Sequence, residues 1–169
     1  ENSISLLQAR TRAIAMQVEQ LLAACVDDIK TLASIPLSRT LYSDFAKSHR
    51  RWVWYRNEKG EDIREYLPLY KEVVYVNLNG VEEIIAGNGS ENRGRVANDD
   101  NIFFTQYGIE SYFKDTLSLK DGDIFVSHLT GFFISRDEYY KKHDNLNRSS
   151  QGLPYNGIIR FASKKMENG

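Results

Sequence analysis

Cysteine, proline and histidine are scarce in this chain of 169 residues, which has one cysteine, three prolines and three histidines. The single Cys25 cannot form an internal disulfide, and it excludes both a cysteine-built zinc site and covalent c-type haem attachment. His49, His128 and His143 stand far apart, with no second ligand at the spacing of a metal-binding motif. The sequence therefore predicts neither a bound metal nor a cofactor.

The chain also lacks a surplus of either charge, because its 22 Lys and Arg residues are balanced by 23 Asp and Glu residues. A nucleic-acid-binding domain usually carries a basic surplus on one face, so we predict no nucleic-acid partner. The longest uninterrupted apolar run, Leu21 to Val26, is far shorter than the ~20 residues that cross a bilayer. No basic-then-apolar signal peptide opens the chain. We expect a globular domain.

Signatures of catalysis are missing as well. There is no Gly-x-Ser-x-Gly elbow and no Ser-x-x-Lys pair. Ser127 and His128 are adjacent in a predicted strand, so their side chains point to opposite faces and cannot act as nucleophile and base together. The glycines of residues 87–94 lack the spacing of a dinucleotide-binding loop. We predict that the domain itself is not an enzyme.

The first third of the chain has the pattern of one long helix. No Gly or Pro occurs from Ser3 to Ser34, and apolar residues recur at steps of three and four until Pro36 ends the run. At about 1.5 Å per residue, such a helix spans roughly 48 Å, which is longer than a small domain is wide. We therefore expect it to extend past its own core or to lie beside a partner. Its start in phase at Glu1 predicts a segment of a longer protein.

The remaining residues alternate short helical and strand patterns. Two β-branched and aromatic runs flank Asn79-Gly80, which is the strongest short-range hairpin signal. The polar, aromatic stretch 49–59 receives no strand or helix, and residues 87–101 are predicted to form a loop. Helices are predicted over 38–48 and 106–119, with a helical turn near 136–142. Sheet strands are predicted over about 71–87, 123–129 and 157–164. This order predicts an α+β fold with a mainly antiparallel sheet flanked by helices.

Arg160 is the first candidate for a ligand site. It stands within an otherwise apolar strand pattern at residues 158–162. A lone cation in such a strand either faces solvent or points into a pocket, where guanidinium geometry favours pairing with a carboxylate.

Polar and aromatic residues of neighbouring segments extend this candidate site. Segments 101–112 and 130–156 would cover one face of the sheet, and tyrosine supplies an apolar wall with a hydroxyl group, as small-molecule pockets require. We predict that Ser127 gives the ligand a hydrogen bond. The predicted walls are Tyr107, Tyr139 and Tyr155.

Short motifs occur along most of the chain, at residues 28–36, 70–80, 111–115, 119–127, 157–162 and 167–169. In this order they resemble the motifs of Cache-type (PAS-like) extracytoplasmic sensor domains. The resemblance implies a PAS-like fold on the outer, periplasmic side of the inner membrane, with a membrane anchor before the long helix. It also implies a cytoplasmic histidine kinase or chemotaxis output. The Arg-x-Trp-Tyr pattern of the amino-acid-binding subgroup is absent between Gly87 and Tyr107.

We therefore expect residues 1–36 to form a signalling helix and residues 37–169 to form a PAS-like ligand-sensing domain. The expected ligand is a small polar metabolite, with carboxylates as one candidate class, and the expected assembly is a homodimer through the N-terminal helix. Two alternatives stay open. One is a ligand-free protein-interaction domain of a membrane receptor, and the other is a cytoplasmic PAS-type cofactor binder.

Overall fold

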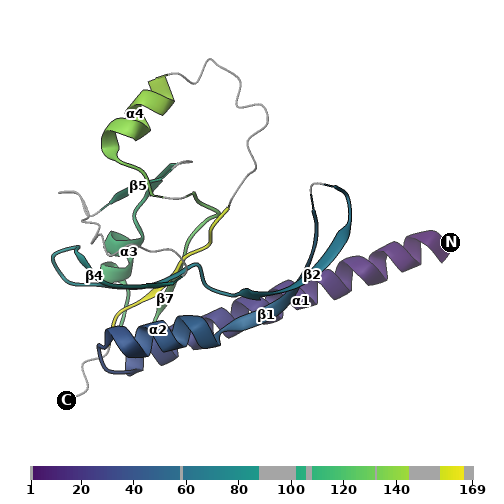
Figure 1. The fold of residues 1–169 in the computed structure, drawn as a ribbon, viewed down its shortest axis with the longest axis horizontal. Helices are drawn as coiled ribbons and strands as arrows, with labels where there is room; N and C mark the ends of the chain where they lie inside the picture. Colours follow the sequence, from purple (N-terminus) through teal and green to yellow (C-terminus); the bar gives the residue numbers. More distant parts are fainter. Residues whose placement is uncertain are drawn as a thin grey trace. The chain divides into compact units, whose positions relative to one another are not determined.

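The structure is a computed structural model that describes residues 2–57, 59–87, 102–105, 108–131, 133–144 and 157–165. It has the predicted α+β fold, in which a long N-terminal helix is followed by short antiparallel strand pairs and short helices (Figure 1). In chain order the elements are α1 (Asn2–Ser34), α2 (Arg39–Ser48), β1 (Arg50–Arg56), β2 (Asp62–Pro68), β3 (Glu72–Val76), β4 (Glu82–Gly87), β5 (Phe103–Thr105), β6 (Gly108–Glu110), α3 (Tyr112–Ser118), β7 (Ile124–Val126), α4 (Arg136–Asp144) and β8 (Phe161–Ser163).

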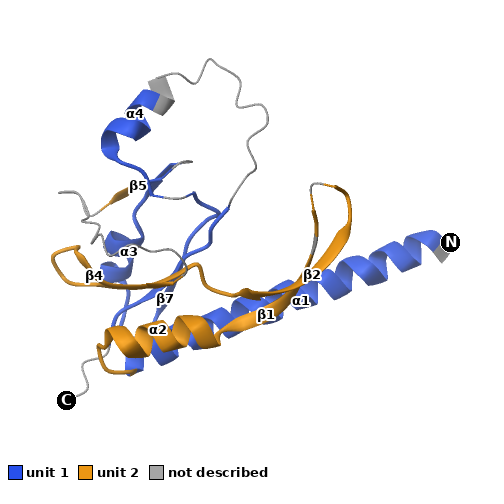
Figure 2. Ribbon diagram, in the orientation of Figure 1, with its two compact units in different colours: residues 1–34, 104–169 blue, residues 35–103 orange. Residues whose placement is uncertain are grey.

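The chain divides into two compact units (Figure 2). Unit 1 contains residues 1–34 and 104–169, and unit 2 contains residues 35–103. Unit 1 is therefore built from the two ends of the chain, while unit 2 is one continuous segment. The functional division into a signalling helix and a sensing part, residues 1–36 and 37–169, stays a prediction.

Helix α1 extends past its own core, as its predicted length required. Every side chain from Ser3 to Gln20 is exposed, whereas Cys25 and Leu32 near the other end of the helix are buried. Strand β8 packs against α1, and Lys165 Nζ donates a hydrogen bond to the Ala33 carbonyl at 3.1 Å. None of the helices in the described ranges is long and apolar enough to span a membrane.

The predicted hairpin around Asn79-Gly80 is confirmed in unit 2. Strands β3 and β4 pair antiparallel, with Val73 opposite Ala86, and helix α2 packs against both of them. Ser38 caps the start of α2 by accepting a hydrogen bond from the Leu41 amide at 3.4 Å. The described core of unit 2 consists of Tyr42, Ala46, Val73, Ile85 and Ala86 together with the buried carboxylate residue Glu82 and Phe103.

Unit 2 also contains a hairpin that the sequence did not predict. Strands β1 and β2 pair antiparallel along their whole length, from Arg50 opposite Pro68 to Arg56 opposite Asp62. These strands include much of the polar, aromatic stretch that received no element.

In unit 1 the predicted helix over residues 106–119 is wrong in its first part. Residues Gly108–Glu110 form strand β6, which pairs with β5, and α3 begins only at Tyr112. The Thr105 hydroxyl, which has no exposed surface, donates to the Gly108 carbonyl at 2.8 Å. This contact and the burial of Glu110 hold the segment extended against its helical pattern.

The last predicted strands are present but short. β7 and β8 pair antiparallel, with Phe125 opposite Ala162, and an isolated bridge between Thr130 and Ile158 continues the same association. The predicted helical turn near 136–142 is confirmed as α4. Residues 88–101 of the predicted loop lie outside the described ranges.

Candidate functional site

Arg160 lies inside unit 1, where it meets an anion of the chain itself. Its Nε donates a hydrogen bond to Oε2 of Glu110, and the two side chains form an ion pair. A second, longer hydrogen bond runs from Nη2 to the Gly131 carbonyl at 3.4 Å. The exposed fractions of the side chains are only 16% for Arg160 and 7% for Glu110, so the pair is largely removed from water.

Aromatic rings surround the guanidinium group. The Arg160 Cζ atom lies 4.0 Å from the ring centroid of Phe133 and 5.9 Å from that of Tyr112. A planar, weakly hydrated guanidinium stacks favourably on an aromatic face. Phe133 is brought there by its bridge to Thr105, and Tyr112 by the first turn of α3. The ion pair therefore sits in an aromatic setting where water competes little with its charges.

The second carboxylate oxygen of Glu110 is unsatisfied. Oε1 is buried and has no hydrogen-bond partner among the described residues. Within the same ranges, no hydrogen bond involves Nη1 of Arg160, whose contacts use Nε and Nη2. Buried polar atoms are nearly always hydrogen-bonded, because leaving one unpaired costs its full desolvation penalty. This pair thus has both an acceptor and a donor to offer a further group.

Ser127 lies beside Arg160 but is held by the backbone. Its hydroxyl accepts a hydrogen bond from the Arg160 amide at 2.8 Å and donates to the His128 carbonyl at 2.7 Å. The Ser127 amide donates in turn to the Arg160 carbonyl at 2.9 Å. Ser127 therefore fixes the backbone of Arg160, and its predicted hydrogen bond to a ligand stays a prediction.

Tyr139 belongs to an aromatic cluster on α4. Its ring centroid lies 5.1 Å from that of Phe104 and 5.5 Å from that of Tyr140. Phe104 directly precedes Thr105, and Thr105 forms a β-bridge with Phe133. The bridge therefore connects this aromatic cluster to the aromatic residues around Arg160. The other predicted wall residues, Tyr107 and Tyr155, lie outside the described residues.

Sequence reasoning missed Glu110 and Phe133. Glu110 fell within a predicted helix, where an acidic residue is expected to face solvent. The available signal was its position one residue after Ile109 and two residues before Tyr112, but that signal does not identify Arg160 as its partner.

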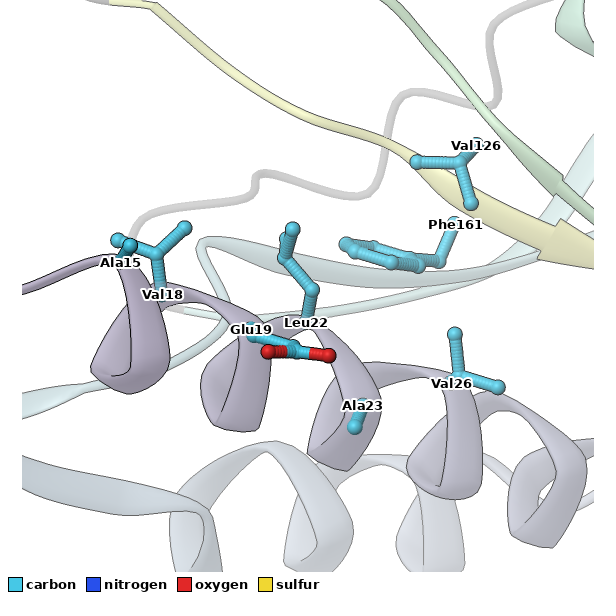
Figure 3. A pocket seen from close by; sticks show the side chains of 8 residues that line it. All are labelled: Ala15, Val18, Glu19, Leu22, Ala23, Val26, Val126 and Phe161. Carbon is cyan, nitrogen blue, oxygen red and sulfur yellow. The ribbon is translucent and has the colours of Figure 1, made fainter. Parts of the chain in front are cut away.

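A separate apolar groove lies between α1 and the β7–β8 pair (Figure 3). Side chains of α1 such as Leu22 point toward Phe161, and Glu19 is the one charged residue of the lining. The lining residues are Ala15, Val18, Glu19, Leu22, Ala23, Val26, Val126 and Phe161. This surface offers a polar metabolite almost nothing to bind, so the Arg160–Glu110 pair is the better candidate site.

Comparison with known proteins adds no family to these observations. No protein-family model, no curated protein and no solved structure matches this chain. Within the described ranges, no group of three or more His, Cys, Asp or Glu side chains is arranged to hold a metal ion.

Proposed function

We propose that the chain is the extracytoplasmic signal-input domain of a membrane-bound receptor, of the Cache (PAS-like) type, and that it binds a small polar metabolite at the Arg160–Glu110 pair. The observation that carries the proposal is the buried Oε1 of Glu110, which has no hydrogen-bond partner among the described residues and lies beside a partly satisfied guanidinium. Ligand sites combine apolar and aromatic walls with a few convergent polar groups, and this pair has that composition.

In this proposal the side chains have distinct roles. Arg160 and Glu110 bind the polar part of the ligand, and Ser127 positions the backbone of Arg160 and serves as a further hydrogen-bonding group. Tyr139 forms part of the wall, with Tyr107 and Tyr155 as its proposed continuation. The reaction of the domain to its ligand is a change of conformation, without catalysis.

A path from the site to the long helix supports a signalling role. Arg160 directly precedes β8, and β8 packs on α1, where Lys165 bonds the Ala33 carbonyl. A ligand that binds one arrangement of Arg160 more tightly than another shifts the population of β8 and α1 arrangements. We propose that α1 passes this shift, within a homodimer, to a cytoplasmic kinase or chemotaxis output of a membrane-anchored protein.

A thermal-shift screen tests the proposal. The chain is heated with amino acids, organic acids, amines, amides and nucleobases, and a bound compound is expected to raise the unfolding temperature by several degrees, because it binds the native state alone. The shift should vanish in Arg160→Met, if circular dichroism shows that this variant folds. Arg56→Gln is the matched control, since it removes an arginine from an exposed pair with Asp62, and it should keep the wild-type shift.

A flat screen of the wild-type chain contradicts the proposal and favours a ligand-free interaction domain. The exposed aromatic residues of β1 would then be the best candidate for a protein-binding surface. Trp52 and Trp54 on β1 are 55% and 68% exposed, and Arg64 stacks on both, 4.6 and 5.7 Å from their ring centroids. Trp and Arg are the residue types that most often dominate protein–protein contacts.

A further inference from the structure

We infer that the ligand of the Arg160–Glu110 site has no net charge and presents both a hydrogen-bond donor and a hydrogen-bond acceptor. This inference rests on the proposed function and specifies the ligand class. It replaces the carboxylate that Arg160 alone suggested in the sequence.

The net charge of the Arg160–Glu110 pair limits the charge of a ligand that it can bind. Arg160 carries one positive charge and Glu110 one negative charge, and they are paired, so the site is neutral before any ligand arrives. Both side chains are largely buried, where an uncompensated charge is costly. A monocarboxylate would leave the filled site with one net negative charge, and a simple amine would leave it with one net positive charge. A neutral or zwitterionic compound leaves the balance intact.

The hydrogen-bonding groups that Arg160 and Glu110 leave unused define what the ligand must supply. Oε1 of Glu110 can only accept, so the ligand must bring a donor to it. Nη1 of Arg160 can only donate, so the ligand must bring an acceptor to it. Phe133 lies against the guanidinium at 4.0 Å, which directs a polar ligand to the N–H edge of Arg160. Two chemistries supply both a donor and an acceptor without net charge. One is a zwitterion with ammonium and carboxylate groups, and the other is an uncharged amide group such as that of a carboxamide or nucleobase.

Arg160 and Glu110 differ in how far solvent reaches them. Oε1 has essentially no exposed surface, whereas the Arg160 side chain keeps 16% of its surface exposed. A ligand can therefore touch Arg160 first, and it reaches Oε1 only if atoms around Glu110 move. Binding through both groups then requires a local movement, as a signal-input domain needs.

The experiment measures affinity by charge class, using calorimetric titration of the full chain. The probes are L-alanine and L-serine as zwitterions, acetamide and uracil as uncharged amides, acetate and lactate as monoanions, and ethylamine as a monocation. We expect binding by the zwitterions or the amides, at least tenfold tighter than by either charged class. Which of the two neutral classes binds identifies the chemistry that supplies the donor and the acceptor.

A charge substitution makes the test sharper. Glu110→Gln leaves Arg160 uncompensated, so the variant should reverse the order and prefer acetate or lactate to the neutral probes by at least tenfold. Asp62→Asn, which removes the carboxylate of the exposed Arg56 pair, is the matched control and should keep the wild-type order. If Glu110→Gln does not fold, the double variant Glu110→Leu with Arg160→Met removes both charges together and should lose binding of every class.

The outcomes separate the two claims. If monoanions or the monocation bind the wild-type chain as tightly as the neutral probes, the neutral-ligand inference is overturned while the proposed sensor function stands. It is overturned in the same way if Glu110→Gln keeps the wild-type order of affinities, or if the folded double variant keeps its affinity. If no probe of any class binds and the broad screen is flat, a buried water is the better account of Oε1, and both claims fall.

Discussion

Tyr42 shows how the core of unit 2 acts on a single ionisable group. This tyrosine of α2 keeps only 4% of its surface exposed. Burial raises the pKa of its phenol above the ordinary value of 10.0, and electrostatic repulsion from Tyr75 raises it further. The neutral phenol is therefore the form that the folded state favours.

This shift predicts a loss of stability in alkali. Above pH 10 the phenol ionises in the unfolded chain before it ionises in the folded one, so the unfolded state binds fewer protons and the free energy of unfolding falls as pH rises. One such group can lower the free energy of unfolding by at most about 1.4 kcal/mol per pH unit. Urea denaturation at pH 8, 10 and 11 should show a steeper loss for the wild type than for Tyr42→Phe.

Tyr66→Phe is the control for this measurement, because that ring is 44% exposed. It should follow the wild-type profile. Equal profiles for wild type and Tyr42→Phe would show that burial of this phenol does not couple to folding.

Of the two residues that form the candidate site, the sequence identified only Arg160. Arg160 was visible because a cation in an apolar strand is unusual. Glu110 was not, because its burial depends on a partner 50 residues away, and no local pattern encodes that distance. The burial of Glu110 depends on its pairing with Arg160, and a single sequence does not show which distant residues pair.

Among the elements, the two hairpins of unit 2 close with the same turn. Oδ1 of Asn57 accepts hydrogen bonds from the amides of Lys59 and Glu61, at 3.0 and 2.9 Å. Oδ1 of Asn77 accepts from the amides two and four residues ahead in the same way, at 2.9 and 3.0 Å. A glycine follows each asparagine by three positions, with φ of +80° at Gly60 and +74° at Gly80.

The turn glycine of β1–β2 gives a prediction about this element. Gly60→Ala should lower the free energy of unfolding by about 1 kcal/mol, because a Cβ disfavours positive φ. No atom lies within 4 Å of that Cβ, so collision adds nothing. Gly60→Asn should cost less, since asparagine tolerates the left-handed region. Urea denaturation monitored by tryptophan fluorescence measures both.

Gly108 provides the matched control. It also has open space around an added Cβ, but its φ lies outside the left-handed range. Gly108→Ala should leave stability unchanged or slightly raised. A Gly60→Ala variant as stable as Gly108→Ala would show that the turn does not constrain folding.

Elements with one apolar face were predictable from sequence, and those without one were not. Helix α1 and the β3–β4 pair have apolar residues at the period of their own structure, and both were identified. Strands β1 and β2 expose Trp52, Arg64 and Tyr66 on one face, where a cation stacks between aromatic rings in place of a buried core. This contact spans the two strands, so it leaves no periodic signal within either.

For the whole molecule, the uncovered half of α1 carries the proposal of a dimer. Ile4, Leu7, Ile14 and Val18 keep between 49% and 66% of their surface exposed. They are spaced by three, seven and four residues, which places them along one side of the helix and suits a two-helix seam.

We expect the chain to associate in a concentration-dependent way through this surface. Replacing Leu7 and Ile14 with serine should weaken the dimer by at least tenfold, because each change removes buried apolar area at the seam. Arg12→Ser and Gln20→Ser change exposed positions on the opposite side of α1 and should leave association intact. Sedimentation equilibrium measures the association of the wild-type chain, the double variant and the controls. A wild-type chain that stays monomeric at high concentration contradicts the proposed dimer.

The division into a discontinuous unit 1 and a continuous unit 2 has a consequence for how the chain acquires its structure. Unit 2 can fold as soon as residues 35–103 are available, and its hairpins join near neighbours in sequence. Unit 1 must bring together groups as distant as Ala33 and Lys165, which are 132 positions apart. Such distant pairings form late, since the chain loses the entropy of the intervening loop before contacts compensate for it. During synthesis, we therefore expect unit 2 to fold before unit 1, because α1 can pack only after β8 has been made.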